Sequence, residues 1–251
     1  MLRLTILRYD SLPSTNTEAA RQAARGAAEG LCVVAREQAQ GRGRRERVWI
    51  SPPDAGLYFS IVLRPRFEMR AWPLITLMCA LAVADALLEA CKLETDIKWP
   101  NDIYARGRKV CGILAETVET PAGRAVVVGI GINLKQDAFP QELRELATSV
   151  EEETGRAPET EELLRSLTLF IARRYDVLHQ PQGAEKILEE LAAHSSYAYG
   201  RHVRVALGDE TLEGTTRGLA GDGALLVETE TGEIRRVHAG DVTAVRKLKQ
   251  G

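Results

Sequence analysis

The most informative stretch of this sequence is residues 38–49, QAQGRGRRERVW, in which four arginines and two glycines fall within seven consecutive positions. Glycine lets a backbone approach a ligand closely, and guanidinium groups bind phosphate or carboxylate through paired hydrogen bonds. A loop of this composition can close over a nucleoside triphosphate and neutralise its charge. Two alternatives are open at this point: a solvated surface loop, the commonest state of an arginine run, and a contact with a nucleic-acid backbone.

The segments before and after this loop have the composition of strands and helices. Residues 31–37 and 57–63 are apolar enough to be buried strands, and the connection between them is too long for a simple turn. Upstream, residues 2–9 predict a strand. Residues 14–18 predict the start of a helix, with Thr15 as its cap and a glutamate three residues later.

Downstream of the loop, one long apolar helix is followed by several strands. Residues 72–91 are rich in alanine and leucine and apolar on nearly every side, which predicts a helix inside the domain. Strands are expected at residues 96–99, 110–118 and 125–134. Residues 142–162 carry eight acids and two arginines, so we expect a solvated loop that leads into an amphipathic helix.

The last fifty residues form a different pattern, with short strands separated by Gly-Asp and Thr-Gly turns. The strands are expected at residues 202–207, 211–217, 224–230, 233–238 and 242–248. This pattern predicts a small β-barrel and divides the chain into domains of residues 1–198 and 199–251.

The overall composition excludes some classes of protein. Thirty-three lysines and arginines against 35 acids give a net charge of −2, which argues against a protein that coats nucleic acid. The start of the chain lacks the apolar block of a secretory signal, and the longest apolar stretch is shorter than the ~20 residues that span a bilayer. The four cysteines are far apart and lie mostly in apolar runs, so we expect reduced core thiols and a cytoplasmic protein.

A second informative segment is residues 98–104, KWPNDIY, followed by residues 109–116, KVCGILAE. Asn101 and Asp102 would lie at the end of a strand, where short polar side chains can meet ligand hydroxyls or a metal-bound phosphate. The alternative for such a pair is a turn or a helix cap. Lys109 opens a strand, so its ammonium group can project into a cleft, although an isolated lysine is usually solvated.

A third segment, residues 126–134, reads VVVGIGINL. It is not a dinucleotide-binding fingerprint, because no third glycine follows and no helix begins there. It predicts a strand from which side chains are missing on one side, so that another group approaches the backbone closely at Gly129 and Gly131. Core packing is the alternative explanation.

Taken together and in this order, these segments resemble the biotin protein ligase family. The matching features are residues 14–16 (STN), 41–49, 98–102, 109–116, 129–133 and 147–149. The resemblance continues into the C-terminal β module and therefore covers essentially the whole chain. It implies an α+β catalytic domain with a mixed sheet, of the biotin/lipoate ligase type related to class II aminoacyl-tRNA synthetases, followed by a small all-β SH3-like barrel.

The resemblance also implies an activity. Members of the family make biotinyl-5′-adenylate from biotin and ATP with Mg²⁺, and then transfer biotin to one lysine of the biotin carboxyl carrier protein of acetyl-CoA carboxylase. Biotin, ATP and this carrier are therefore the expected partners, without DNA or a membrane, and a homodimer is left open.

Site residues follow from the resemblance position by position. The residues expected to bind biotin are Ser14, Thr15, Asn16, Gln38, Arg42, Gly43, Arg44, Lys109 and Gly112. Those expected to bind ATP or the adenylate are Arg42, Arg44, Arg45, Trp49, Asn101, Asp102, Lys109 and Asn133. The histidines show no metal-ligand spacing, so no protein metal site is expected.

Four of these residues are expected to be catalytic. The carboxylate of biotin and the α-phosphate of ATP repel each other, so catalysis must come mainly from positioning and charge neutralisation by Arg42, Arg44 and Lys109. The attacking amine in the second step belongs to the carrier lysine, whose reference pKa is about 10.4. Asp102 is the candidate general base or orienting group for that amine.

Two departures from the family pattern matter. The family's loop usually has glycine at the position of Glu46, and a carboxylate there can alter loop closure. Only thirteen residues precede Ser14, so we expect a ligase without an operator-binding helix-turn-helix. The alternatives are a lipoate-type ligase, which would not be expected to show the Arg-Gly loop, and a biotin-sensing regulator that binds nucleic acid through residues 42–47.

Overall fold

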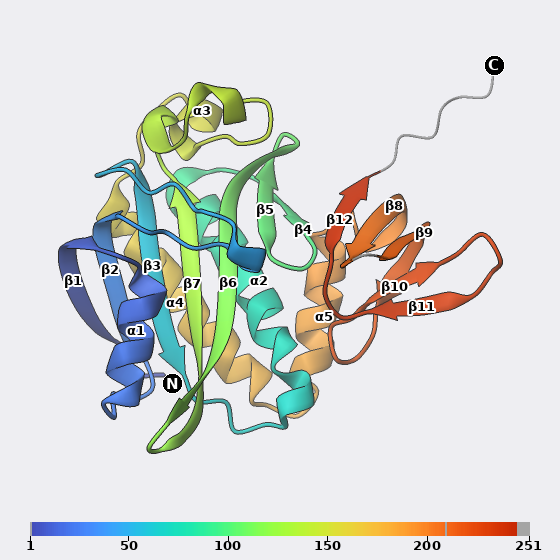
Figure 1. Cartoon of the computed structure of the whole chain (residues 1–251), viewed down its shortest axis with the longest axis horizontal. Coiled ribbons are helices and arrows are strands. Elements are labelled where there is room, and N and C mark those ends of the chain that lie inside the picture. Colours follow the sequence, from blue (N-terminus) through green and yellow to red (C-terminus); the bar gives the residue numbers. More distant parts are fainter. Residues whose placement is uncertain (1, 209, 245–251) are drawn as a thin grey trace.

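A seven-stranded mixed sheet supports the first half of the chain in the computed structural model, which describes residues 2–208 and 210–244 (Figure 1). The strand order is β1-β2-β3-β7-β6-β5-β4, with β1 parallel to β2 and the other neighbours antiparallel. The strands are β1 (Thr5–Leu12), β2 (Leu31–Gln38), β3 (Gly56–Leu63), β4 (Asp96–Lys98), β5 (Asp102–Ala105), β6 (Arg108–Thr120) and β7 (Gly123–Asn133).

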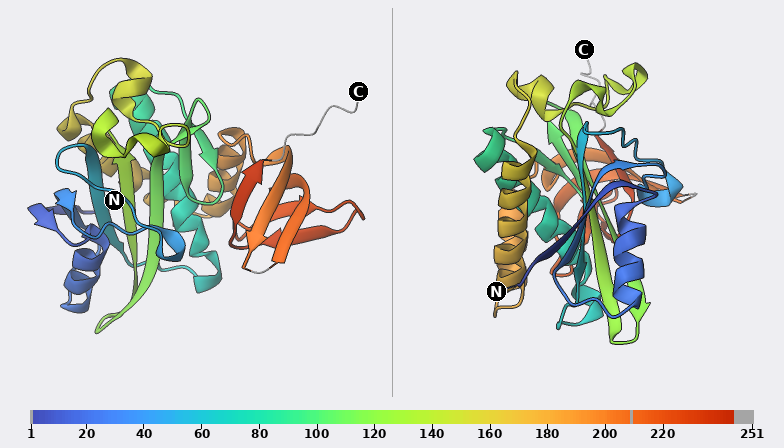
Figure 2. Two further views of the ribbon diagram at one scale, coloured as in Figure 1. Left: turned by 45° about the horizontal axis from the view of Figure 1, so that its top comes forward. Right: turned by 90° about the vertical axis from the view of Figure 1, so that its left-hand side faces the viewer.

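Helices cover both faces of this sheet (Figure 2). Helix α1 (Thr15–Ala24) packs on one face, and α2 (Pro73–Cys91), α4 (Thr160–Leu178) and α5 (Gly183–Ala193) lie on the other. Every residue of β3 is buried, because this central strand is covered on both sides. The sheet therefore forms a three-layer core that holds the N-terminus of α1 beside β3 and β7.

Helix α2 is the internal helix that the sequence predicted. Thirteen of its 19 residues are buried against the sheet and against α4 and α5. The segment Met69–Cys91 is long and apolar enough to span a membrane by composition alone, but 72% of its most apolar window is buried within this protein. Its hydrophobicity is thus explained by the core that it fills.

The predicted cap of α1 is wrong. Ser14, not Thr15, occupies the N-cap position, and its side chain makes no capping hydrogen bond. Thr15 instead donates to Gln38, and Glu18 bonds to Arg21 rather than back to the cap. The polar side chains of the first turn bond to β2 and to a later residue of the helix, so the predicted capping hydrogen bonds do not form.

Asn101 and Asp102 follow a strand, as predicted, and Asn101 lies in the turn that was the alternative. These residues lie in a tight connection between β4 and β5, and Asp102 begins β5 directly opposite Lys98. The sequence analysis missed β5 because four residues are too few to establish a strand pattern. The hairpin turns both polar side chains back toward β6.

The acidic segment of residues 142–162 is not a simple loop. It contains the short helix α3 (Val150–Thr154), whose Ser149 cap accepts a hydrogen bond from the Glu152 amide. The side chain of Glu153 is buried and pairs with Arg108. Some of the acids that were expected to be solvated are thus buried and paired inside the fold.

Helix α5 was also not predicted. Short 3₁₀ turns occur at η1 (Arg44–Glu46), η2 (Met69–Ala71), η3 (Gln136–Ala138) and η4 (Gln141–Leu143).

The C-terminal part is a five-stranded antiparallel sheet of order β11-β10-β9-β8-β12, as the sequence predicted. Its strands are β8 (Tyr199–Leu207), β9 (Glu210–Leu219), β10 (Leu225–Glu228), β11 (Ile234–Val237) and β12 (Asp241–Ala244). Residues 245–248 of the last predicted strand lie outside the described residues. The indole of Trp99 donates to the Gly223 carbonyl at 2.9 Å, which joins this part to the β4 side of the large sheet.

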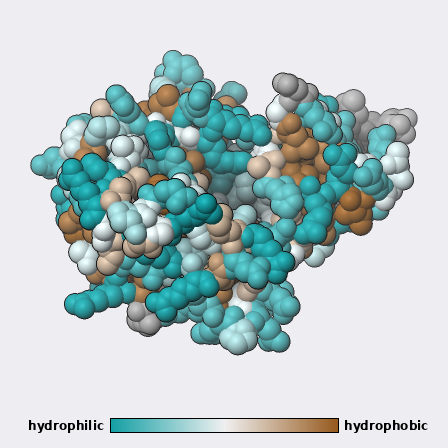
Figure 3. Space-filling view, turned by 60° about the horizontal axis from the view of Figure 1, so that its bottom comes forward, coloured by the Kyte–Doolittle hydropathy of each residue, from teal (hydrophilic) through white to brown (hydrophobic). Residues whose placement is uncertain are grey.

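The outer surface agrees with the balanced composition. The face turned forward in Figure 3 is mainly hydrophilic, with separate hydrophobic spots. The four cysteines are buried thiols, as predicted.

Candidate active site

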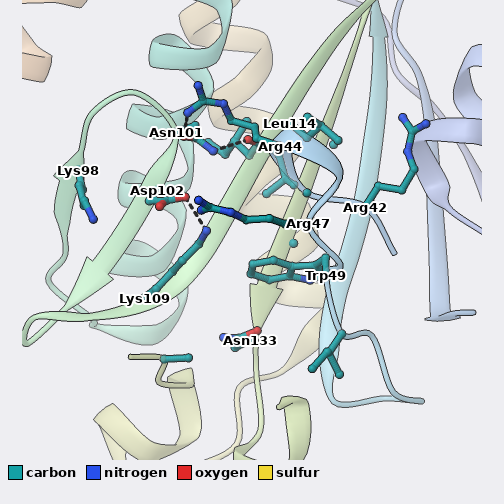
Figure 4. A pocket seen from close by; sticks show the side chains of 18 of the residues that line it. Arg42, Arg44, Arg47, Trp49, Lys98, Asn101, Asp102, Lys109, Leu114 and Asn133 are labelled. Atoms are coloured by element: carbon teal, nitrogen blue, oxygen red, sulfur yellow. Dashed lines mark hydrogen bonds and ion pairs between the residues drawn. The ribbon is translucent and has the colours of Figure 1, made fainter. Parts of the chain in front are cut away.

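A cavity of about 590 Å³ lies where the sheet, the arginine-rich loop and the C-terminal domain meet. Its walls come from the start of α1, residues 42–44 and 47–50, the β4–β5 hairpin, β6 and β7, with residues 240–243 closing one side. Every site residue predicted from the sequence lines this cavity except Arg45. Residues that are far apart in the chain are thus brought together, and their roles can be assessed from their contacts (Figure 4).

Buried neutral polar groups form one end of the cavity. The Thr15 amide and hydroxyl both donate to Gln38 Oε1, at 2.8 and 3.0 Å. Gln38 in turn donates to Ser51 Oγ at 2.8 Å, and the Asn16 amide donates to Glu116 Oε2 at 2.8 Å. These groups are held by one another before any ligand arrives, so this end is preorganised.

Three glycines of β6 and β7 make room for side chains at this end. A Cβ atom on Gly129 would overlap Asn16 Oδ1, and one on Gly131 would lie 2.5 Å from Trp49 Nε1. The predicted close approach to both glycines is therefore confirmed, and the approaching groups belong to the protein. Gly112, opposite Gly131 in the β6–β7 register, would place a Cβ 2.9 Å from the same indole ring. Its role beside biotin stays a prediction.

The arginine-rich loop has an unusual backbone. Arg45 and Glu46 have φ angles of 53° and 61°, a left-handed conformation that costs a residue with a side chain roughly 1–2 kcal/mol. The loop is closed by a bridge between Arg42 and Val48 and by a hydrogen bond from the Gly43 amide to the Arg47 carbonyl at 2.7 Å. The glutamate that departs from the family pattern thus occupies a position where glycine is favoured.

Three of the four loop arginines are paired with carboxylates of the protein. Arg42 pairs with Glu116, and both Arg45 and Arg47 pair with Asp241 of the C-terminal domain. Arg45 also donates to the Ala206 carbonyl at 3.2 Å, which takes it to the C-terminal domain and out of the cavity wall. Its predicted contact with the nucleotide stays a prediction.

Arg44 differs from the other loop arginines. It donates to Asn101 Oδ1 at 2.8 Å and reaches the Gly240 carbonyl at 3.5 Å, and among the described residues it forms no ion pair. Burial lowers the pKa of the Arg44 guanidinium, which Asp241 and Asp102 oppose, yet arginine stays protonated in proteins. A half-buried cation with neutral partners at a cavity wall is a strong site for an incoming anion.

Lys109 and Asp102 form an ion pair inside the cavity (Figure 4). The distance from Lys109 Nζ to Asp102 Oδ1 is 2.6 Å, and the ammonium lies 5.3 Å from the centroid of the Trp49 ring. This Asp102 oxygen is buried and, within the described part of the chain, accepts no hydrogen bond besides the ion pair. The pair therefore places one exchangeable cation and one carboxylate at the centre of the site.

The opposite wall is more apolar. Asn133 donates to the Thr148 carbonyl at 3.0 Å, which holds the segment after β7 against the end of the sheet. Phe139, Leu143 and Leu146 line the cavity beyond it, and the side chain of Leu146 is largely exposed. A flat apolar ring is the kind of group that such a wall can cover.

No preformed metal site is visible in the described ranges, where no three His, Cys, Asp or Glu side chains lie close enough to hold an ion. The carboxylates that line the cavity are Asp102, Glu145 and Asp241. Mg²⁺ usually binds through substrate phosphates and one or two carboxylates, so these residues fit an ion that is shared with ATP.

The sequence analysis missed several groups that the structure brings to the site. Glu116, Lys98 and Asp241 lie in the cavity or contact its arginines, and Ser60 contacts Asn16 from β3. Signals existed for Lys98 and Glu116, which lie within the matching segments 98–102 and 109–116, and for Ser60, the one hydroxyl among the apolar side chains of residues 57–63 apart from Tyr58. Asp241 could not be found from the chain order, because its contact depends on how the two sheets pack.

Comparisons with known proteins agree with this geometry. Residues 9–133 match the biotin/lipoate A/B protein ligase family, and residues 199–243 match the biotin protein ligase C-terminal domain. The bifunctional ligase/repressor BirA of Bacillus subtilis is 37% identical over 243 residues, covering 94% of this chain and 73% of that protein. A biotin–acetyl-CoA-carboxylase ligase of Mycobacterium tuberculosis is 33% identical, covering 93% and 86%.

A solved structure is similar over nearly the whole chain. The biotin protein ligase of Aquifex aeolicus in complex with biotin and ATP superposes with a TM-score of 0.83 at 30% identity, covering 97% of this chain and 99% of that one. The chain belongs to the biotin protein ligase family. The resemblance, the fold class and the enzyme class predicted from the sequence are confirmed.

Proposed function

We propose that this chain is a biotin protein ligase that makes biotinyl-5′-adenylate from biotin and ATP and then transfers biotin to a lysine of a carrier domain. The observation that carries the proposal is that neutral donors and acceptors line the same cavity as Arg42, Arg44 and Lys109. Relatives named biotin–acetyl-CoA-carboxylase ligase support the carrier, and the Aquifex aeolicus complex supports both small substrates.

The neutral end suits the head group of biotin. Its ureido ring offers N–H donors and a carbonyl acceptor, which would be costly to bury without partners. Ser14, Thr15, Asn16 and Gln38 supply such partners from the start of α1 and the end of β2. With the head group there, the carboxylate of the ligand points toward Arg42 and the loop.

The cationic end suits the first reaction. A biotin carboxylate oxygen attacks the α-phosphorus of ATP, a new C–O–P linkage forms, and the bond between the α- and β-phosphates breaks to release pyrophosphate. Both reactants are anions, so Arg44 and Lys109 lower the barrier by neutralising charge around the transferring phosphorus. Arg42 can exchange Glu116 for the ligand carboxylate.

The Lys109–Asp102 ion pair suits the second reaction. The carrier amine must lose a proton before it attacks the acyl carbon of the adenylate, with AMP as the leaving group. If Lys109 bonds to the phosphate, the Asp102 carboxylate is released from its partner and can accept or orient that proton. Lys109 then stabilises the departing AMP.

Mg²⁺ belongs to this proposal as the ion that travels with ATP and neutralises its phosphates. Asp102, Glu145 and Asp241 are the carboxylates that can contribute to holding it. The roles of the arginines, Lys109 and Asp102 are inferred from the contacts of their own side chains and do not depend on where the ion binds.

The domain boundaries and the cellular compartment can also be inferred. We propose that residues 1–198 form the catalytic domain and 199–251 the SH3-like domain, and that the protein works in the cytoplasm, where its buried thiols stay reduced. A homodimer is compatible with residues 115–120 of β6, which pair with β7 on one side and lie beyond the pairing of β6 with β5 on the other. We propose no nucleic-acid partner, because the basic patch of the loop is local and the chain as a whole is slightly acidic.

The test is to incubate the protein with biotin, ATP, Mg²⁺ and an apo biotin carrier domain, and to measure the mass of the carrier and the pyrophosphate released. The proposal expects one biotinyl group on the carrier, dependent on ATP, and no modification when lipoate replaces biotin. An unchanged carrier mass, or modification with lipoate alone, would overturn it.

A further inference from the structure

The hydroxyl of Ser60 lies among apolar side chains in the core of the sheet. It lies on β3, where all eight residues are buried, and it is fully inaccessible. Its Oγ is 2.7 Å from Asn16 Oδ1 and 2.8 Å from Thr15 Oγ1. Burial of a hydroxyl is unfavourable unless it is hydrogen-bonded, so these contacts with the two head-group residues account for its presence.

The hydrogen-bonding capacity of Asn16 is almost fully used inside the protein. Its Oδ1 accepts from Ser60, and its Nδ2 donates to the Leu114 carbonyl at 3.2 Å and to Glu116 Oε2 at 2.8 Å. A side-chain amide has two N–H donors and two acceptor lone pairs. Both donors are thus engaged, and one lone pair of Oδ1 is left for a ligand.

The position of the amide is restricted as well as its bonds. Asn16 Oδ1 lies so close to Gly129 that any side chain there would overlap it. A half-turn of the amide would bring its oxygen toward two acceptors, the Glu116 carboxylate and the Leu114 carbonyl, and the Ser60 hydroxyl would then have to accept from the NH₂ group instead of donating. That arrangement would place two acceptors together at Glu116.

We propose that Ser60 and Glu116 are positioning residues that fix Asn16 as a hydrogen-bond acceptor in the head-group end of the cavity. This inference rests on the proposed function, because the ligand N–H that Asn16 accepts is then a ureido N–H of biotin. Ser60 and Glu116 act through Asn16 and need not touch the substrate. The site thereby selects a ligand that presents a donor at this point, since a rotated amide would repel it.

Glu116 extends this arrangement to the arginine-rich loop. The same carboxylate oxygen that accepts from Asn16 also pairs with Arg42. When Arg42 leaves for a ligand carboxylate, Glu116 keeps its bond to Asn16, so the acceptor orientation outlasts loop movement. The two ends of the cavity are therefore joined through one carboxylate.

The experiment measures biotin binding to the full chain by calorimetry and the biotin KM and kcat of the ligase reaction. Ser60→Ala should weaken biotin binding and raise the biotin KM by about tenfold, with kcat within about twofold, because Asn16 Oδ1 loses the buried donor that holds it in place. In an Asn16→Ala background, the same Ser60→Ala change should have a clearly smaller effect, because only the contact of Ser60 with Thr15 is left to lose.

A second variant and a control complete the test. Glu116→Gln alters a partly exposed side chain, and we expect about threefold weaker biotin binding without loss of folding. It keeps the proposal testable if Ser60→Ala fails to fold. The matched control is Ser166→Ala. It removes another buried serine hydroxyl, which lies on α4 and donates to Glu89 of α2 at 2.7 Å, and it should leave biotin binding unchanged.

The outcomes separate this inference from the proposed function. If the unaltered protein binds no biotin, the proposed function fails and this inference fails with it. If it binds biotin but Ser60→Ala and Glu116→Gln bind equally well, or if the Ser60→Ala loss is unchanged in the Asn16→Ala background, only the positioning role is overturned.

Discussion

The two ends of the cavity are built on opposite principles. At the head-group end, Thr15, Asn16 and Ser60 are buried neutral groups whose partners belong to the protein. At the loop end, Arg42 is a partly exposed cation and Arg47 a largely exposed one, and they pair with Glu116 and Asp241 in contacts that an anion can replace. The head-group end is suited to a neutral polar group, and the loop end is suited to an anion.

The two ends therefore lose their conformational freedom at different stages, one during folding and the other when the ligand binds. The neutral end is ordered when the protein folds, so a ligand meets donors and acceptors already in place. The loop end exchanges one ion pair for another when the ligand binds, and exposed ion pairs contribute only about 0–1 kcal/mol each. A ligase needs both, since it must recognise biotin before the reacting anions are brought together.

The largest effect should follow removal of Arg44, because this half-buried cation has no carboxylate partner among the described residues. Arg44→Ala should slow biotinyl-adenylate formation by about 100-fold or more. The measurement is biotin-dependent pyrophosphate release in single-turnover conditions. Arg8→Ala, which removes an exposed arginine paired with Glu161 outside the cavity, should stay within about twofold. A rate for Arg44→Ala within about threefold of the original would remove Arg44 from the mechanism.

Salt should affect the two ends differently. Raising KCl from about 50 to about 500 mM shortens the screening length by roughly threefold, so affinity for ATP should fall by about threefold to tenfold. Affinity for biotinol, the uncharged alcohol of biotin, should change by less than about twofold, because it meets the neutral end. Calorimetric titration of each ligand across the salt series makes the comparison. Parallel salt dependence of the two ligands would mean that the ends are not distinct.

The partner of the loop can be removed without touching the neutral end. Asp241→Asn takes away the carboxylate shared by Arg45 and Arg47, so the ligand-free loop should be cleaved by trypsin about threefold to tenfold faster. Biotin together with ATP should restore protection. Asp222→Asn, which breaks a pair with Arg236 within the C-terminal domain, is the control and should not change cleavage of the loop. Equal cleavage of both variants would show that Asp241 does not hold the loop.

The smallest effect concerns the helix that carries Thr15 and Asn16. The Arg21 guanidinium, with Gln22 and the Tyr9 hydroxyl, lowers the pKa of Glu18 from 4.5 to about 2. Since the folded pKa lies below the unfolded one, this stabilisation is present above about pH 4.5 and is lost as the pH falls toward 2. Glu18→Gln should lower the midpoint of thermal unfolding at pH 7 by about 1–3 °C.

The pH dependence provides the check on Glu18. The difference in unfolding midpoint between Glu18→Gln and the original protein should shrink between pH 4.5 and pH 2. A constant difference across that range would show that ionisation of Glu18 does not stabilise the helix.

The sequence predicted residues at both ends of the cavity and missed a partner at each end. Arg42, Arg44 and Lys109 carry their chemistry in side-chain type and local spacing, so they could be found along the chain. Ser60 and Asp241 act through residues 44 and about 195 positions away, and such contacts exist only after the strands and domains have packed. β5 and α3 were missed because four or five residues are too few to establish a periodic pattern, whereas α2 and α4 are long enough to show one. The 11-residue α5 was missed although it is longer.

The most direct test of this account is a crystal structure of the protein with biotinyl-5′-adenylate. The account predicts that Arg42 has left Glu116, that Arg42 and Arg44 donate to carboxyl or phosphate oxygens of the ligand, and that Asn16 keeps its bonds to Ser60 and Glu116. An adenylate bound in the cavity with Arg42 still paired to Glu116 and Arg44 directed away from the phosphate would contradict it.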